Sequence, residues 1–517
     1  MSEVSRSPRV IVIAMEVGDG KLIRQWADQG ELPVLKRLAD EGSWGWLESP
    51  AEYLHVSAWP TLYTGTSAGR HGVYYTFQPA PGIQGHRRFA PGQYGMPTLW
   101  KVLSDAGKRC TVFDAPYTYP EDGFSGSQVC DWGAWAQYLG PTSTPPALIK
   151  ELTNACGRYP LGLEAHDIGL VHLDAQEMKE RLIGAIHAKT DATCWLMDRE
   201  PWDFFLMVYG ETHPAAHYCL QLSGQADGQS IDAHDQVLLR SVYQALDQGI
   251  GKILERIDDE TTVFVVSGDG LGPNHSGWHL LPEVLERLGY FATAGQKQPA
   301  AAEEASQDSG AKKDLVKMVR DLLPVGFRKA LARRLPTGLR DALAKRVDMA
   351  DIDWSRTQAF CLPTDLEGYI RINLRGREPE GIVEPGEEYE AVCQAMTAAL
   401  TGLINPATGQ PAVKQVIRVD DMFPGDRRAY LPDLIVVWTG DTVISALESA
   451  AIGQVKGKSP DGRVGTHASP GFVIGRGPAI RRGGTLAGGH ILDLAPTVLS
   501  RFGVASDQME GRVWDLS

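Results

Sequence analysis

The sequence predicts an α/β fold in which helices cover both faces of a central, mostly parallel sheet. Short runs rich in Val, Ile and Phe recur between turn residues, as is typical of strands that are buried on both faces. Helical segments separate these runs, and this alternation is the pattern of βαβ units rather than of an all-β protein. The predicted strands lie in residues 9–15, 109–116, 203–210, 261–268, 432–440 and 471–475.

The N-terminal segments show this alternation clearly. The run 9–15 (RVIVIAM) is followed by Leu22, Ile23 and Trp26, whose spacing places them on one face of a helix. The segment 32–42 (LPVLKRLADEG) then predicts a second helix, which its final Gly ends. One strand and two helices are therefore expected within the first 42 residues.

The size and composition fit a cytoplasmic enzyme with more than one folding unit. The chain has 517 residues, of which 43% are hydrophobic, so it can bury a large core. A net charge of −14 argues against broad binding to nucleic acid or to anionic membranes. The segment before the first strand (MSEVSRSPR) is short and polar and lacks the apolar region of a secretory signal. No run approaches the roughly 20 apolar residues of a membrane span. Seven scattered cysteines without a C-x-x-C pair are expected to be reduced thiols.

The chain is expected to divide into a catalytic core, residues 1–290 and 350–517, and an insert at 291–349. Residues 294–311 have few large apolar side chains, which predicts a flexible linker. Residues 312–346 are rich in Lys and Arg and carry Leu and Val at helical spacing, so they are predicted to form basic amphipathic helices. We expect this insert to act as a lid or an oligomer contact, with a lipid-surface role as the alternative.

Five segments place metal-binding side chains at or near the ends of hydrophobic runs. In an open α/β sheet, ligands gather beyond the carboxyl ends of the strands, so these segments are expected to converge although they are distant in the sequence. The candidates are Glu16, the pair His55 and Ser57, the pair His213 and His217, Asp269, and His467.

Each candidate also has an ordinary interpretation. Two His residues four apart arise by chance on a helix face, but the apolar run 204–208 directly before His213 and His217 favours ligation. An Asp at the end of a strand, such as Asp269, is also a common turn or cap residue.

The order of these segments resembles the type I phosphodiesterase/nucleotide pyrophosphatase branch of the alkaline phosphatase superfamily. The resemblance covers most of the chain and runs through LPVLKRLADEGSWG, WPTLYTGTSAGRHGVY, VVSGDGLGP, RINLRGREPEGIVEPGEEYE, YLPDLIVVW and GHILDLAPTVLSRFGV. It implies an alkaline phosphatase-like fold and hydrolysis of a phosphoester or a related anionic ester at a pair of metal ions. It also implies that the segment around 116–190, with Trp132, Trp135 and Tyr138, forms a wall over the metals that selects the substrate. Local core packing accounts equally well for each of these aromatics.

The site positions depart from the family pattern at four points. Glu16 stands where the family has Asp, and His55 stands where it has its Thr or Ser nucleophile. His213 replaces the Asp of an Asp-x-x-x-His pair, and Gly268-Asp269 replaces an Asp-His pair. His217 and His467 match the family pattern. His71, His275 and His279 are expected to be scaffold or pocket residues, because related segments of the family also carry polar residues at these positions. Because the replacements can themselves bind metals, they favour a rebuilt site over a decayed one.

The family's geometry sorts the candidates into two sets of three ligands. One set is His213, His217 and His467, and the other is Glu16, His55 and Asp269. Three protein ligands with an open position are the usual arrangement of a catalytic metal. Imidazole suits Zn and Fe, so one or two divalent transition-metal ions are expected, with Zn as the first choice and Fe or Mn as alternatives.

The replacement of the family's Thr or Ser by His55 removes the obvious covalent nucleophile. Water activated by the metal is then the expected attacking group, because a bound cation lowers the pKa of water to about 7. Ser57, two residues away, is the candidate nucleophile if the covalent mechanism is kept.

The sequence therefore predicts a metal-dependent hydrolase that acts on a small anionic ester through metal-activated water. Two alternatives stay open, a non-hydrolytic, iron-dependent redox enzyme on the same fold and a catalytically silent binding protein. The exchange of oxygen ligands for imidazoles is the change that redox chemistry would need. The expected partner is a small anionic substrate, without nucleic acid or stable membrane insertion, and homo-oligomerisation is left open.

Overall fold

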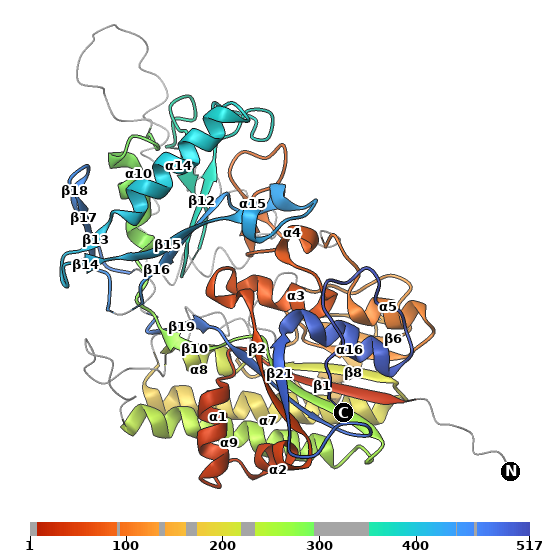
Figure 1. The fold of residues 1–517 in the computed structure, drawn as a ribbon. Helices are drawn as coiled ribbons and strands as arrows, with labels where there is room; N and C mark the ends of the chain where they lie inside the picture. The colour runs from red at the N-terminus through yellow and green to blue at the C-terminus, as the bar shows by residue number, and fades with distance from the viewer. Residues whose placement is uncertain are drawn as a thin grey trace, which may run out of the picture.

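The computed structural model describes residues 8–89, 94–133, 140–161, 173–218, 233–293, 351–364, 366–440, 442–459 and 463–516. Two parts are stacked along the long axis of the molecule, the lower one around a large sheet and the upper one around smaller sheets (Figure 1). Most of the predicted insert at 291–349, and the aromatics Trp135 and Tyr138, lie outside the described residues.

The lower part is built on a nine-stranded sheet with the strand order β21-β2-β20-β9-β1-β8-β5-β6-β7. Five adjacent strands, β9, β1, β8, β5 and β6, run parallel to one another, and β20 and β7 flank them in antiparallel pairing. This arrangement confirms the predicted α/β fold with a mostly parallel sheet. The strands are β1 (Arg9–Met15), β2 (Ser43–Glu48), β5 (Cys110–Phe113), β6 (Gly126–Cys130), β7 (Thr142–Thr144), β8 (Phe204–Tyr209), β9 (Thr261–Ser267), β20 (Gly471–Arg476) and β21 (Gly484–His490).

Side chains alternate along the central strand β1 between two hydrophobic cores on opposite faces of the sheet. Ile11 and Ile13 belong to the core shared with α1, α2, α7 and α9, whereas Val10 and Val12 belong to the core shared with α3, α5 and α16 (Figure 1). Helices on both faces explain why β1 is apolar at every position after Arg9. The helices are α1 (Gly20–Asp28), α2 (Pro33–Glu41), α3 (Ala58–Thr64), α5 (Leu99–Asp105), α7 (Ala175–Arg199), α9 (Ala233–Leu254) and α16 (Leu494–Arg501).

The upper part contains a four-stranded sheet, β11-β12-β16-β15, and a small sheet, β14-β13-β17-β18. Helices α10 (Leu281–Arg287) and α14 (Glu387–Thr401) pack on these sheets in a hydrophobic core of their own. The strands are β11 (Ala359–Cys361), β12 (Gly368–Ile372), β13 (Ile404–Asn405), β14 (Gln410–Pro411), β15 (Val413–Arg418), β16 (Leu434–Trp438), β17 (Ala446–Ser449) and β18 (Gly453–Lys456).

The predicted strand at 432–440 forms as β16, but it lies in the upper antiparallel sheet instead of the central one. Its side chains are buried throughout, because α10 and α14 cover the sheet from one side and the lower part lies on the other. A continuous apolar run indicates burial on both faces, and it does not identify the sheet to which the strand belongs.

The two parts meet at the antiparallel strand pair of β10 (Gly270–Pro273) and β19 (Gly465–Ala468), beside helix α8 (Thr212–Tyr218). Shorter elements complete the fold: β3 (Phe77–Gln78), β4 (Arg87–Arg88), α4 (Ala68–His71), α6 (Leu148–Cys156) and α15 (Val419–Met422). The division into a core at 1–290 and 350–517 with a wall around 116–190 stays a prediction. No helix in the described ranges is long and apolar enough to cross a membrane.

Candidate metal centre

Four parallel strands of the central sheet are each followed by a buried acidic residue at their carboxyl ends. Glu16 and Asp114 directly follow β1 and β5, and Glu211 and Asp269 come two residues after β8 and β9. Val17, next to Glu16, and Asp114 both have φ of 55°, in the left-handed region that a β-branched residue rarely adopts. Strained backbone of this kind clusters at functional sites, where the surrounding structure holds it in place.

Three buried imidazoles meet above this edge of the sheet. His213 and His217 lie one turn apart on α8, so that their rings share a face of the helix, and His467 lies on β19. Their ligand nitrogens all lie within 4.8 Å of one another. Among the residues that the structure describes, this is the one group of three or more His, Cys, Asp or Glu side chains arranged so that they could hold a metal ion.

The outer nitrogens of two of these rings are bonded to the protein. His217 Nδ1 donates to the carbonyl oxygen of Gly465 at 2.7 Å, and His467 Nδ1 pairs with Asp269 Oδ2 at 2.5 Å. Gly465 packs so closely on α8 that a Cβ atom there would lie 2.1 Å from the Ala216 oxygen. Bonds of this kind fix the ring tautomer and leave Nε2 with its lone pair facing the cluster, which is how ligating histidines are usually supported.

One pair of nitrogens in the cluster has nearly the spacing that two ligands of one metal ion require. His217 Nε2 and His213 Nε2 are 3.0 Å apart, and two nitrogens on a tetrahedral zinc ion, each at about 2.05 Å, would be about 3.3 Å apart. Burial and the neighbouring His217 and His467 lower the pKa of His213 well below its usual value. His213 is therefore neutral, and the neutral imidazole is the form that binds metals. The three residues fit a divalent transition metal.

The second predicted set, Glu16, His55 and Asp269, is arranged differently. Glu16 Oε1 accepts a hydrogen bond from Trp59 Nε1 at 2.9 Å. Asp269 pairs with His467, and its other oxygen accepts from the Val17 backbone N–H at 2.9 Å. His55 lies beside His467, with 4.7 Å between the ring centroids, so the structure brings it to the cluster. The role of this set as ligands to a second ion stays a prediction.

A carboxylate of the upper part contacts the His55 ring at Nδ1. Its Nδ1 lies 3.0 Å from Glu367 Oε2, and the same oxygen accepts from the Tyr369 hydroxyl at 3.1 Å. Because the carboxylate engages Nδ1, the Nε2 atom lies on the opposite side of the His55 ring. No sequence pattern indicates Glu367 in this role, because it comes more than 300 residues after His55 and does not directly follow a strand.

Ser57 lies beside His71, but the hydrogen bonds do not activate it as a nucleophile. The Val73 backbone N–H donates to His71 Nδ1 at 3.1 Å, so the ring proton is on Nε2. That N–H lies 3.3 Å from Ser57 Oγ and 3.1 Å from Thr61 Oγ1, and it donates to these hydroxyls instead of accepting from them. Burial also lowers the pKa of His71 to about 3. His71 therefore cannot act as the base that a serine nucleophile needs.

A buried charged cluster next to the site was missed by the sequence reasoning. The ammonium group of Lys189 lies 3.0 Å from Asp114, 3.7 Å from Glu211 and 2.8 Å from the Gly133 oxygen. The Tyr159 hydroxyl donates to Glu211 at 2.7 Å. Burial alone would lower the pKa of Lys189, but the two carboxylates outweigh this effect and raise it. The ammonium is therefore charged, and the cluster holds the segment that leads into His213.

Asp114 and Glu211 follow buried strands in the same way as Glu16 and Asp269, so their positions at strand ends could have identified them. Lys189 offers no such signal. It lies in the middle of the helix α7, where a lysine ordinarily indicates a face exposed to solvent.

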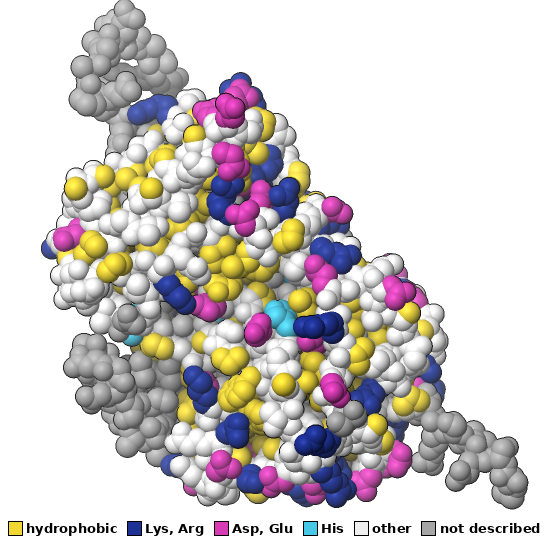
Figure 2. All heavy atoms as spheres, viewed as in Figure 1, with side chains coloured by type: hydrophobic (Ala, Val, Ile, Leu, Met, Phe, Trp, Pro, Cys, Tyr) yellow, Lys and Arg dark blue, Asp and Glu magenta, His cyan; other side chains and the backbone are white. Residues whose placement is uncertain are grey.

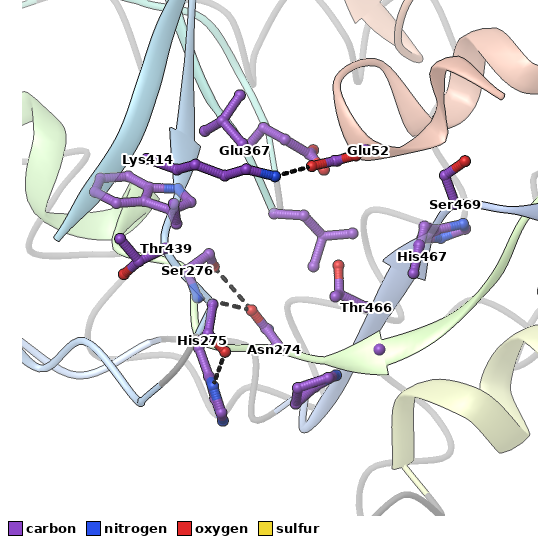
Figure 3. A pocket seen from close by; sticks show the side chains of 17 residues that line it. Glu52, Asn274, His275, Ser276, Glu367, Lys414, Thr439, Thr466, His467 and Ser469 are labelled. Atoms are coloured by element: carbon purple, nitrogen blue, oxygen red, sulfur yellow. Dashed lines mark hydrogen bonds and ion pairs between the residues drawn. The ribbon is translucent and has the colours of Figure 1, made fainter. Parts of the chain in front are cut away.

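A pocket of about 310 Å³ opens next to His467, between the β10–β19 strand pair and the upper sheet. Figure 3 shows Lys414, Glu52 and Glu367 along one wall, Asn274 and His275 opposite, and Thr466 beside His467. Figure 2 shows histidine, acidic and basic side chains gathered where the two parts of the molecule meet. A pocket of this size suits a small metabolite.

A sequence model of the type I phosphodiesterase/nucleotide pyrophosphatase family matches residues 10–468. The chain belongs to this family. Its structure is similar to that of phosphonoacetate hydrolase from Sinorhizobium meliloti 1021 in complex with phosphonoformate, at 12% identity over 96% of each chain with a TM-score of 0.51. It is also similar to an inactive form of murine ectonucleotide pyrophosphatase/phosphodiesterase 5 in complex with AMP, at 11% identity over 96% of each chain with a TM-score of 0.47. No match was found among curated proteins.

Membership in this family confirms the resemblance seen in the sequence and places the chain among hydrolases of phosphoric esters. The likeness to the solved phosphonoacetate hydrolase, at 12% identity, is a likeness of fold. The assignment of the three-histidine cluster to one metal site of the family, and of Glu16, His55 and Asp269 to the other, stays a prediction.

Proposed function

We propose that the chain is a metal-dependent hydrolase of a small anionic ester, a phosphodiester or a related compound. The observation that carries the proposal is the convergence of three buried imidazoles within 4.8 Å at the carboxyl edge of the sheet. The bonds from His217 to Gly465 and from His467 to Asp269 support ligation, because metal-binding histidines are usually held in this way. Family membership supports ester hydrolysis.

His213, His217 and His467 would hold the ion. When bound, a divalent transition metal such as zinc acts as a Lewis acid and lowers the pKa of water to about 7. The chain's own groups orient this centre, since Asp269 fixes the ring of His467 and the Gly465 carbonyl fixes that of His217. Because all three histidines are buried, the site also excludes bulk water, which strengthens the electrostatic interactions inside it.

We assign His55 to the reacting side of the site. The Glu367 carboxylate orients its ring, and an imidazole backed by a carboxylate can move a proton to or from a reacting group or serve as a ligand to a second ion. Ser57 is not expected to attack, because His71 donates to its hydroxyl. Water is therefore the proposed attacking group.

A second candidate function is supported by the chemistry of the cluster itself. All three side chains of the group are imidazoles, a ligand type that suits iron as well as zinc and contributes no negative charge. A non-hydrolytic, iron-dependent enzyme on the same fold is the second proposal. The identity of the metal and its visible spectrum distinguish the two.

The test is metal analysis of protein purified without added metal, followed by assays with bis(4-nitrophenyl) phosphate, 4-nitrophenyl phosphate and 4-nitrophenyl sulfate. His217→Ala and His467→Ala are expected to lose stoichiometric metal and hydrolysis together. His187→Ala, at an exposed position on α7, is the matched control and is expected to keep both. Full metal content in the two site variants would overturn the assignment, and a metal-loaded protein without any esterase activity would favour the redox enzyme.

We further propose a cytoplasmic location and a small-molecule partner. The six described cysteines are free thiols, which fits a reducing compartment. The net charge of −14 argues against nucleic acid as a partner. Whether the chain forms a homo-oligomer is left to a measurement of its mass in solution.

A further inference from the structure

The charges in the pocket beside His467 are unevenly distributed. Among the 17 described residues that line it, Lys414 is the one Lys or Arg, and Glu52 and Glu367 are the carboxylates. Glu367 is committed to His55 and to the Tyr369 hydroxyl. Lys414 and Glu52 are therefore the charged groups that remain to meet a ligand.

Lys414 and Glu52 form an ion pair that spans the pocket from one part of the molecule to the other. The ammonium of Lys414, on β15 of the upper sheet, lies 2.6 Å from Glu52 Oε1, at the end of the short helix Pro50–Glu52 of the lower part. Both side chains are partly open to solvent, at 54% and 36% relative exposure, so either can change partner without leaving a buried charge. Glu52 raises the pKa of Lys414, which keeps the ammonium charged.

An ammonium group has three N–H donors, and a single carboxylate oxygen accepts one of them here. Figure 3 shows the ammonium and Glu52 on the wall of the pocket, with Thr466 and His467 across from them. If a ligand extends from His467 into the pocket, the end of the ligand that lies away from His467 therefore comes near the ammonium of Lys414. Val437, Trp438 and Leu366 supply the apolar part of the wall.

We propose that Lys414 binds a second anionic group on the substrate, so that the ester carries a carboxylate or a phosphate on its non-reacting side. This assignment rests on the proposed function and deepens it by naming the substrate class. Glu52 holds the ammonium in place in the free enzyme and competes with the substrate anion for it. The two halves of the ion pair are therefore expected to have opposite effects on catalysis, whereas a pair that only joins the two parts of the molecule would give effects of the same sign.

The experiment uses three 4-nitrophenyl phosphodiesters whose second ester group is carboxymethyl, phosphonomethyl or carbamoylmethyl. The carbamoyl probe has nearly the shape of the carboxymethyl probe but no distal charge. With metal-loaded wild-type enzyme, kcat/KM is expected to be roughly ten- to hundredfold higher for one or both anionic probes than for the carbamoyl probe, as a hydrogen bond between charged groups predicts. The two anionic probes decide between a distal carboxylate and a distal phosphate.

Lys414→Met is expected to abolish this preference and to leave kcat/KM for the carbamoyl probe within about twofold of wild type. Glu52→Gln is expected to raise kcat/KM for the preferred anionic probe, because it removes the competing carboxylate. Lys36→Met is the matched control: it removes an exposed lysine that is likewise 2.6 Å from a carboxylate oxygen, but on α2. It is expected to change none of these values.

The outcomes separate the inference from the proposed function. If wild type hydrolyses none of the probes with metal present, the proposed function fails. If it hydrolyses all three equally well, or if Lys414→Met and Glu52→Gln lower activity toward every probe alike, the hydrolase stands and the role of Lys414 is overturned.

Discussion

Replacing Lys189 with Met tests whether the buried charged cluster supports the site. The side chain of Lys189 is fully buried, and its ammonium balances Asp114 at 3.0 Å and Glu211 at 3.7 Å. Methionine fills a similar volume without the charge, so the substitution removes the cation and leaves two carboxylates in the interior. The expected loss of stability is therefore caused by the uncompensated charges and not by a cavity.

The structure gives the expected magnitude. Removing one partner of a buried ion pair typically costs about 3–5 kcal/mol of stability, because the remaining charge loses its compensation. Asp114 keeps two backbone N–H bonds of 2.8 Å, from Trp132 and Gly133, which offsets part of this cost. We expect Lys189→Met to lower the free energy of unfolding by about 3 kcal/mol, at the lower end of this range. Adding Glu211→Gln removes one of the uncompensated charges, so the double variant should lose at least about 1 kcal/mol less than the sum of the single variants.

Urea titrations of metal-free protein, followed by tryptophan fluorescence, measure these differences. Lys252→Met, at an exposed position on α9, is the control and should change stability by less than about 0.5 kcal/mol. A loss below about 1 kcal/mol for Lys189→Met, or strict additivity in the double variant, would refute the assignment of charge compensation to this cluster. Zinc affinity measured on the same variants shows whether the loss extends to the metal centre.

Four further variants test neighbouring groups. His71 has a pKa of about 3 in the folded chain and about 6.5 when unfolded, so the unfolded state gains a proton first and stability should fall as the pH drops from about 6.5 to about 3. His71→Gln should make the urea midpoint depend less on pH in that range, and an unchanged pH dependence would contradict this. Ser57→Ala should keep most hydrolytic activity, whereas His55→Ala should lose it together with any second ion; a Ser57→Ala enzyme that binds its full metal complement without turning over would restore the covalent mechanism. Asp269→Asn should weaken zinc binding by about ten- to hundredfold, because it disturbs the partner of His467, while chelator titration still counts one ion at saturation.

The sheet could be predicted because its strands are buried on both faces. The runs at 9–15, 203–210 and 261–268 are apolar through their central positions, and they form the buried strands β1, β8 and β9. The run at 432–440 gives the same signal and forms β16 in another sheet. Burial is thus encoded locally, whereas the choice of sheet depends on packing between distant segments, which a local pattern does not contain.

The site was predictable at the level of residues but not of atoms. The sequence predicted that His213, His217 and His467 come together, and the structure brings their ligand nitrogens within 4.8 Å of one another. It could not show that Asp269 would pair with His467, since convergence places side chains near one another without deciding which atoms bond. Glu367 was not predictable because its partnership with His55 depends on how the two parts of the molecule meet.

The distribution of charge at this edge of the sheet favours one tightly bound ion. Asp269 directs one oxygen to His467 and the other to the Val17 N–H, so binding a second ion would compete with both interactions. Asp114 and Glu211, and to a lesser extent Glu16, raise the pKa of Lys189, so part of the acidic edge is already balanced by a cation of the protein. The three histidines bring no negative charge of their own, which leaves a divalent ion among them with its full Lewis acidity. A second ion bound by Glu16, His55 and Asp269 would thus be the weaker of the two, and the chemistry would depend on the three-histidine site.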